Sequence, residues 1–183
     1  MDIELIEKAK LATSTSYSPY SNFKVGAAVR MSDGRIFTGS NQENVAYSAC
    51  LCAERVALLY ACANAGDSYP VSIAIAAYKD GDFIENFITP CGECCQILVE
   101  MEKRFAHDIT IYLYGKKETK KLESSKELLP FAFKELGNSS FLIPNYDKTH
   151  TQIHIKKLFQ NILYNVFCSC IHTCNAVYVS LCR

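Results

Sequence analysis

The chain has 183 residues, with 19 basic and 19 acidic side chains and therefore no formal net charge. This length fits one globular domain with a full core, and a neutral chain has no charge excess with which to bind nucleic acid or an anionic membrane. We therefore expect a small-molecule partner, with no nucleic acid and no membrane among the partners. The opening stretch MDIELIEKAKLA lacks the pattern of a secretory signal, which predicts a cytoplasmic protein.

Ten cysteines stand out in this composition. A disulfide framework is typical of small exported chains, and this chain is neither small nor marked for export. Metal binding or burial in the core is the better interpretation of the cysteines. Uncharged apolar runs stay shorter than about 18 residues, so a transmembrane span is not expected.

The hydrophobic pattern divides most of the sequence into helices and strands. Near-helical spacing of apolar residues indicates helices, β-rich runs indicate strands, and Asp33-Gly34 favours a tight hairpin turn. The apolar run VSIAIAAY at 71–78 is typical of a central strand covered on both faces. The predicted order is helix 2–12, strands 25–31 and 35–39, helix 50–65, strand 71–78, helix 92–104, strands 109–114 and 119–123, and a short helical turn within 124–133. This order predicts an α/β three-layer sandwich, in which a mixed five-stranded sheet carries helices on both faces.

Composition changes near Gly137, which predicts a compact domain at 1–137 and a C-terminal tail at 138–183. The tail carries four basic side chains and one acidic side chain, four cysteines and no glycine. Its apolar residues recur at helical spacing, so we expect either an amphipathic helix or a disordered segment. Such a helix would cover an apolar patch, pair with a partner or lie on a membrane. A second metal site at Cys168, Cys170, His172 and Cys174 is a disfavoured alternative.

Three cysteines carry the strongest chemical signal, in CAER at 52–55 and PCGECC at 90–95. Zinc at a catalytic site takes three protein ligands and leaves the fourth position to water. Cys52, Cys91 and Cys94 supply that number, and each lies at the start of a predicted helix, where the positive helix end favours a thiolate. A closed structural site with Cys95 as fourth ligand is less favoured, because adjacent helical residues point about 100° apart. Inert buried thiols are the remaining alternative.

Glu54 lies two residues after Cys52, where it can approach a metal-bound water without being a ligand. A carboxylate there can take a proton from that water and return it to a substrate nitrogen. The pattern Cys-x-Glu followed by Pro-Cys-x-x-Cys is that of the zinc-dependent deaminases. Glu54 is therefore the candidate catalytic residue.

Over about residues 3–136 the sequence resembles the small, three-cysteine cytidine deaminases. The matching stretches are SPYSNFKVGAAV at 18–29, GRIFTGSNQENVAYS at 34–48, CAER at 52–55, PCGECCQ at 90–96 and ELLP at 127–130. Five motifs in matching order and spacing are far more specific than one pair of cysteines. The resemblance implies a cytidine deaminase-like fold, one Zn²⁺ per subunit, and a homotetramer whose subunits share active sites.

The resemblance also implies an activity, the hydrolytic deamination of cytidine and 2′-deoxycytidine to uridine and 2′-deoxyuridine with release of ammonia, in pyrimidine salvage. Zinc would activate water for attack at C4, while Glu54 would move protons to N3 and to the leaving amine. For each aromatic residue, core or interface packing is the alternative role. The implied substrate-binding residues are Phe23 beside the pyrimidine, Asn41 and Glu43 at the ribose 3′-hydroxyl, Tyr47 from a neighbouring subunit, and Phe131 or Phe133 closing the site.

Arg55 and the two helix N-termini are the positive groups available to offset the charge of three thiolates. Similar deaminases often carry an arginine directly after the last cysteine ligand, where this chain has Cys95, and the difference predicts weaker turnover. Two other functions stay open, deamination of a modified cytosine nucleoside and a non-catalytic zinc-binding module. Editing of polynucleotides is disfavoured, because Glu43 would repel a 3′-phosphate.

Overall fold

A mixed six-stranded sheet forms the middle of residues 1–134, the part of the chain that the computed structural model describes. The strand order is β2-β1-β3-β5-β6, and β4 pairs with β3 beside this path. β3 and β5 are parallel, whereas the other pairs are antiparallel. The strands are β1 (Lys24–Met31), β2 (Ile36–Ser40), β3 (Pro70–Lys79), β4 (Asp82–Phe83), β5 (Thr110–Leu113) and β6 (Lys120–Leu122).

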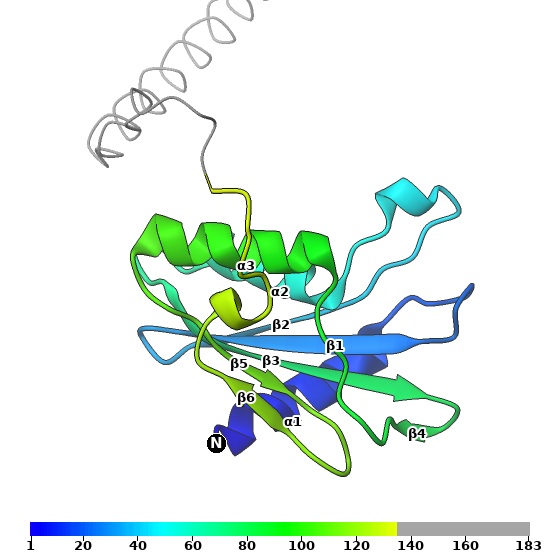
Figure 1. The fold of residues 1–183 in the computed structure, drawn as a ribbon. Coiled ribbons are helices and arrows are strands. Elements are labelled where there is room, and N and C mark those ends of the chain that lie inside the picture. The colour runs from blue at the N-terminus through cyan, green and yellow to red at the C-terminus, as the bar shows by residue number, and fades with distance from the viewer. Residues whose placement is uncertain (135–183) are drawn as a thin grey trace, which may run out of the picture. The chain divides into compact units, whose positions relative to one another are not determined.

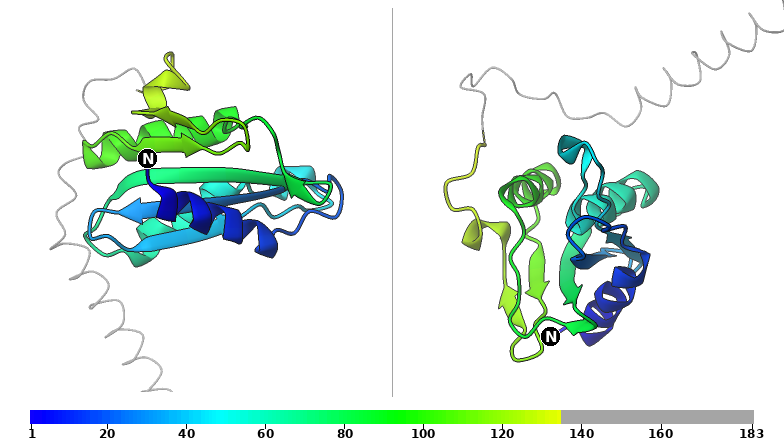
Figure 2. Two further views of the ribbon diagram at one scale, coloured as in Figure 1. Left: turned by 90° about the horizontal axis from the view of Figure 1, so that it is seen from below. Right: turned by 90° about the vertical axis from the view of Figure 1, so that its right-hand side faces the viewer.

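Helices cover both faces of this sheet (Figure 1). Helix α1 (Ile3–Ala12) lies on one face, and α2 (Ala53–Asn64) and α3 (Gly92–Phe105) lie on the other (Figure 2). Three short 3₁₀ helices complete the set, η1 (Thr13–Thr15), η2 (Tyr47–Ala49) and η3 (Ser125–Glu127). The predicted α/β sandwich with helices on both faces is confirmed. The sheet has six strands rather than the predicted five, because the expected turn after β3 also contains the short strand β4.

The central strands send alternate side chains to the two faces of the sheet, and each face has its own core. On β1, Val29 packs toward α2 and α3, whereas Ala28 packs toward α1. On β3, Ile75 likewise packs toward α2 and α3, and Ala74 packs toward α1. The continuous apolar run of β3 thus reflects cover on both faces, as predicted.

Two glycines allow the helices to approach the sheet closely. A Cβ atom on Gly26 of β1 would collide with the backbone of α1 at Ala9, and a Cβ atom on Gly39 of β2 would collide with the backbone of α2 at Ala57. Each strand therefore needs glycine at the point of contact. The close approach at Gly39 holds α2 against the sheet and so sets the position of its first residues.

The N-terminus of α1 is fastened to β1 by an acidic cap. The Asp2 carboxylate accepts a hydrogen bond from the backbone N–H of Leu5 at 3.1 Å, which satisfies one of the free donors of the first turn. Arg30 of β1 donates to both oxygens of the same carboxylate, at 2.7 and 2.9 Å. One side chain thus caps a helix and joins it to the sheet.

Helix α2 begins at Ala53 and not at Cys50, where the sequence pattern placed its start. The backbone N–H groups of Gln42 and Leu51 each donate to the carbonyl of the other, both at 2.9 Å. This pairing holds the chain extended as far as Cys52, the N-cap residue. This backbone pairing has overridden helix propensity, and the result places Cys52 at the open end of the helix.

Within residues 1–134 we find no helix that combines the length and the apolar character needed to cross a membrane. The predictions for residues 138–183, which are the amphipathic helix or disordered tail and the second metal site, lie outside the described residues.

Candidate active site

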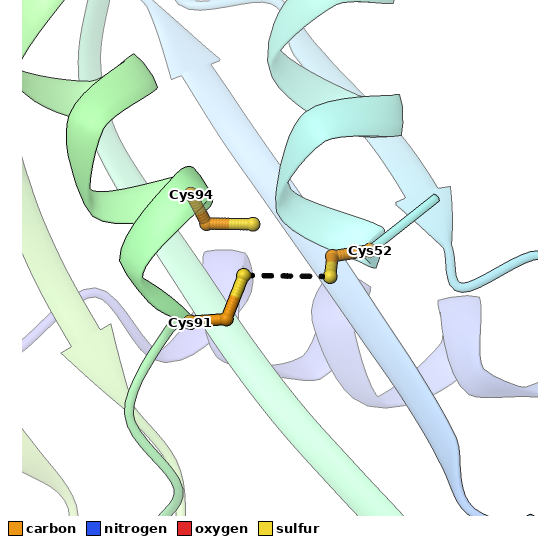
Figure 3. A group of neighbouring side chains, drawn as sticks. All are labelled: Cys52, Cys91 and Cys94. Carbon is orange, nitrogen blue, oxygen red and sulfur yellow. Dashed lines mark hydrogen bonds between the residues drawn. The ribbon is translucent and has the colours of Figure 1, made fainter. Parts of the chain in front are cut away.

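The three predicted cysteine ligands come together between the starts of two helices. Cys52 is the N-cap residue of α2, Cys91 is the N-cap residue of α3, and Cys94 lies in the first turn of α3. Neither N-cap side chain makes a capping hydrogen bond, so both sulfurs are available for other partners. Figure 3 shows the three sulfur atoms pointing toward one another from the two helices.

The spacing of these sulfurs fits a tetrahedral zinc ion. All three sulfur atoms lie within 4.8 Å of one another, and those of Cys52 and Cys91 are 3.7 Å apart. Two sulfurs bound to one zinc at about 2.3 Å in tetrahedral geometry lie about 3.8 Å apart. In the described part of the chain this metal-binding group has three members and no fourth, which corresponds to a site with one open position.

Cys95 lies outside this group. It is buried, and its thiol donates to the carbonyl oxygen of Pro90 at 3.5 Å. Adjacent helical positions point in different directions, so Cys95 faces away from the sulfurs of its neighbours. The geometry gives no support to a closed four-cysteine site built with Cys95.

The electrostatics of the sulfurs favour a thiolate. Hydrogen bonds from the Cys94 and Cys91 thiols, together with the charge of Arg55, lower the pKa of Cys52 to about 6, although burial opposes the change. The same hydrogen bond raises the pKa of Cys94, which holds its proton while Cys52 carries the charge. The Cys52 thiol thus loses its proton near neutral pH, and zinc binding requires deprotonated cysteine ligands.

Glu54 is a buried carboxyl group in the first turn of α2, only 4% exposed. Burial raises the pKa of Glu54 to about 7, and negative charge on Cys52 adds to the rise, whereas hydrogen bonding from Cys94 opposes it. A carboxyl group that titrates near pH 7 can both accept and donate a proton at physiological pH. These properties suit a proton carrier beside a metal.

A cavity of about 300 Å³ opens beside the cysteines and Glu54, at the lower end of the size range of small-molecule sites. A neighbouring depression of about 240 Å³ shares Glu43 and Cys50 with it, and is also lined by Tyr20, Ser21 and Tyr47. The larger cavity is lined by Val25, Asn41, Gln42, Glu43, Cys50, Leu51, Cys52, Ala53, Glu54, Ile88, Thr89 and Cys91.

Asn41 and Glu43 both line the cavity, and the fold holds each of them in place. The Asn41 amide oxygen accepts from Val25 N and Ser16 Oγ, and its Nδ2 donates to the Phe23 carbonyl. The second N–H of the Asn41 side-chain amide therefore remains for a ligand. Hydrogen bonds from the Ser21 hydroxyl and from backbone N–H groups hold the pKa of Glu43 below its usual value, so this side chain is a carboxylate at neutral pH.

The predicted aromatic residues do not line the larger cavity of the single chain. Phe23 packs against the core between the sheet and α2. Tyr47 is exposed and meets Tyr20 edge to face, with ring centroids 6.5 Å apart. Phe131 and Phe133 are also exposed, on the segment that follows η3. Their predicted roles at the substrate stay predictions.

Comparison with family models assigns the chain to a protein family. Residues 1–107 match the family model described as the cytidine and deoxycytidylate deaminase zinc-binding region. The chain belongs to this deaminase family. Family membership agrees with the cysteine geometry, and together they establish zinc as the cofactor of the site, as predicted.

Two individual comparisons extend over most of the described residues. The cytidine deaminase of Sporosarcina psychrophila is 37% identical over 134 residues, which are 73% of this chain and 92% of the relative. The crystal structure of cytidine deaminase from Burkholderia pseudomallei superposes with a TM-score of 0.62 at 40% identity, over 73% of this chain and 99% of that one. About a quarter of this chain thus has no counterpart in that deaminase structure.

Several residues of the deaminase cavity were not predicted from the sequence, among them Leu51, Ile88 and Thr89. Ile88 and Thr89 lie immediately before Pro90-Cys91, so closeness to a ligand motif was the one available signal. Cys50 lines both depressions, and its sulfur accepts a hydrogen bond from the backbone N–H of Asn44 at 3.2 Å.

Proposed function

We propose that this chain catalyses the zinc-dependent hydrolytic deamination of cytidine and 2′-deoxycytidine. One observation carries the proposal, the convergence of three cysteine sulfurs beside a buried glutamate at a cavity sized for a small molecule. Family membership supports it, as do relatives that are themselves named cytidine deaminases.

The reaction consumes one water and replaces the C4 amine of cytosine with a carbonyl oxygen, releasing ammonia. Cys52, Cys91 and Cys94 would hold the zinc, which would supply a bound water of lowered pKa for the attack. Glu54 as carboxylate accepts the proton of the attacking water and passes it to N3. It then accepts the second proton and gives it to the amine, which leaves as ammonia. Its pKa of about 7 suits both directions of transfer.

Asn41 and Glu43 are the proposed ribose-binding residues. The free N–H of Asn41 and the Glu43 carboxylate are complementary to a hydroxyl group, which both donates and accepts. A 3′-phosphate at this position would instead place two negative charges together. The pair therefore favours a free nucleoside over a polynucleotide, and a Glu43→Gln variant should lose activity on cytidine while discriminating less against a 3′-phosphate.

The assay for the proposed reaction is the loss of ultraviolet absorbance when cytidine is incubated with the purified chain. Removal of zinc with a chelator and the Glu54→Ala variant should each abolish the change, and returning zinc should restore the first but not the second. Zinc binding without turnover would favour the non-catalytic zinc-binding module. Turnover of a modified cytosine nucleoside in preference to cytidine would favour the other alternative.

We also infer a homotetramer with shared active sites, acting in the cytoplasm in pyrimidine salvage. Support comes from two exposed apolar side chains, Leu51 in the cavity wall and Tyr47 in the wall of the neighbouring depression, because such residues commonly mark interfaces. Light scattering should give four chains per particle, and Tyr47→Ala should impair substrate binding. A fully active monomer contradicts the shared site. Cell fractionation tests the location.

Residues 1–137 are the proposed catalytic domain, and 138–183 are a tail without a catalytic role. A chain ending at Gly137 should therefore bind zinc and deaminate cytidine at the rate of the full chain. Loss of either property on truncation would assign the tail a part in the site or in assembly.

We also expect Cys95 to lower turnover, because it stands where similar deaminases often carry an arginine. A Cys95→Arg variant tests this expectation. An unchanged rate and pH profile in that variant would contradict it.

A further inference from the structure

The zinc site is divided between two helices that no covalent link holds together near the metal. Cys52 belongs to the start of α2, whereas Cys91 and Cys94 belong to the start of α3. The affinity of such a site depends on how far the metal-free protein already holds its ligands in place, because any disorder must be removed on binding. A contact that fixes one helix start against the other would therefore strengthen the site.

Arg55 and Glu93 make such a contact. Nη1 of Arg55, in the first turn of α2, lies 2.9 Å from Oε2 of Glu93, in the first turn of α3. Among the ion pairs of residues 1–134, this is the one that joins the two helices. Glu93 lies in the sequence between the two α3 ligands, so the contact is made within the metal-binding turn itself.

The Arg55 end of this contact is held firmly. Its Nη2 donates to the carbonyl oxygen of Cys50 at 2.9 Å, whereas its buried Nε has no hydrogen-bond partner within residues 1–134. The side chain is 20% exposed, whereas that of Glu93 is 74% exposed. The Arg55 guanidinium is a cation at neutral pH and so attracts the Glu93 carboxylate. The ion pair of Glu93 with Arg55 thus joins the start of α3 to the start of α2.

We infer that Glu93 is a positioning residue for the metal, which holds the start of α3 against Arg55 and so keeps Cys91 and Cys94 in reach of Cys52. The inference rests on the zinc site of the proposed function but not on the reaction. Charge alone predicts the opposite effect, since the Glu93 carboxylate would repel the three thiolates and so weaken the site. The two effects differ in direction, so they can be separated by experiment.

The test is zinc affinity, measured on the full chain by competition with a chromophoric chelator, for wild type, Glu93→Ala and Glu93→Gln. Glutamine keeps an oxygen that can accept from Arg55 but removes the charge. We expect Glu93→Ala to weaken zinc binding by about two- to fivefold, the range for a largely exposed ion pair, and to speed zinc release to the chelator. Glu93→Gln should stay closer to wild type. The difference between wild type and Glu93→Ala should shrink at about 1 M salt, where exposed charges are screened.

Glu100→Ala is the matched control, because Glu100 is an exposed glutamate of the same helix whose side chain makes no hydrogen bond or ion pair within residues 1–134. It should leave zinc affinity unchanged. Equal affinity for Glu93→Ala and wild type overturns the inference, and so does tighter binding by both Glu93 variants. Cytidine deamination measured on the same samples separates the two claims. If the protein deaminates cytidine but the Glu93 variants bind zinc like wild type, only the positioning role is refuted. If the protein binds zinc but does not deaminate cytidine, only the proposed activity is refuted.

Discussion

The sulfur atoms of Cys52 and Cys91 lie 3.7 Å apart, although the two residues are 39 positions apart in the sequence. The intervening chain forms α2, β3 and β4 before α3 begins. Cys94 is brought to the same point by one further turn of helix. The fold thus assembles a three-sulfur site from two N-termini, and the account of function depends on that assembly.

Replacing one ligand should remove the metal. Cys94→Ser is expected to lower zinc affinity by at least about a hundredfold and to abolish deamination, because a serine hydroxyl is a poor substitute for a thiolate. Cys95→Ser is the matched control, since Cys95 is the adjacent buried cysteine and lies outside the metal-binding group. It should keep one zinc per chain by elemental analysis. Equal loss of zinc in both variants would mean that the ligand set has been assigned wrongly.

Glu54→Gln should separate metal binding from catalysis. The amide keeps nearly the same shape but cannot carry a proton, so turnover of cytidine should fall by about 10²- to 10⁴-fold while zinc content stays unchanged. The measurement is the turnover number together with zinc per chain on the same preparation. A Glu54→Gln protein that retains zinc and full activity would falsify the proton-transfer role.

The Asp2 carboxylate should contribute stability that depends on pH. Its hydrogen bond with Arg30 lowers the pKa of Asp2 below its usual value of about 3.9. A lowered pKa means that the stabilisation is fully present above the unfolded value and is lost as pH falls through the folded value. Asp2→Asn keeps a helix cap but removes the ion pair, so its deficit in unfolding free energy should be present at pH 7 and vanish at strongly acidic pH.

Asp2→Ala removes the cap as well, and should cost about 1 kcal/mol more than Asp2→Asn at pH 7. Denaturant unfolding followed by circular dichroism measures both variants. Glu7→Gln serves as control, because Glu7 pairs with Lys10 on the exposed side of the same helix and should change stability little. A deficit of Asp2→Asn that grows toward low pH would contradict the assigned sign.

Glu102 of α3 should be essential for the stability of the domain. Its buried carboxylate accepts from the backbone N–H groups of Ile109 and Ser125, both at 2.9 Å, and from the hydroxyls of Ser124 and Ser125. Glu102→Ala leaves these buried donors unpaired and should lower the free energy of unfolding by about 2–4 kcal/mol.

Glu102→Gln is the informative companion to this variant. It retains one acceptor oxygen, and the two serine hydroxyls can rotate to accept from the new amide N–H, so we expect a loss of about 1 kcal/mol. Chemical denaturation of the two variants beside wild type provides the comparison. Stabilities within error of one another would show that the hydrogen-bond network does not hold η3 and β5 on α3.

Local patterns predicted most elements of the fold because their signals are strong and short in range. The hairpin of β1 and β2 turns at Gly34, which has a φ of 87° as the Asp-Gly pair suggested. β4 was missed because it contains two residues and follows directly on a tight turn in which Asp80 and Gly81 have positive φ. Periodicity cannot reveal a strand of that length.

The metal ligands could be predicted because spacing and residue type carry their chemistry. The wall of the cavity could not, since Ile88 and Thr89 reach it by way of the loop between β4 and α3, whose path depends on tertiary packing. The delayed start of α2 has the same origin. Its cause is the pairing of Gln42 with Leu51, a contact that the helix-forming sequence after Cys50 gave no sign of.

The ligands around the bound zinc distinguish an open three-cysteine site from any other arrangement. X-ray absorption at the zinc edge of the full chain, loaded with one zinc, should show three sulfur ligands at about 2.3 Å and one lighter oxygen or nitrogen ligand. Binding of a cytosine-nucleoside analogue should change the lighter ligand and leave the sulfurs in place. Four sulfur ligands, or two, would contradict an open three-cysteine site between α2 and α3.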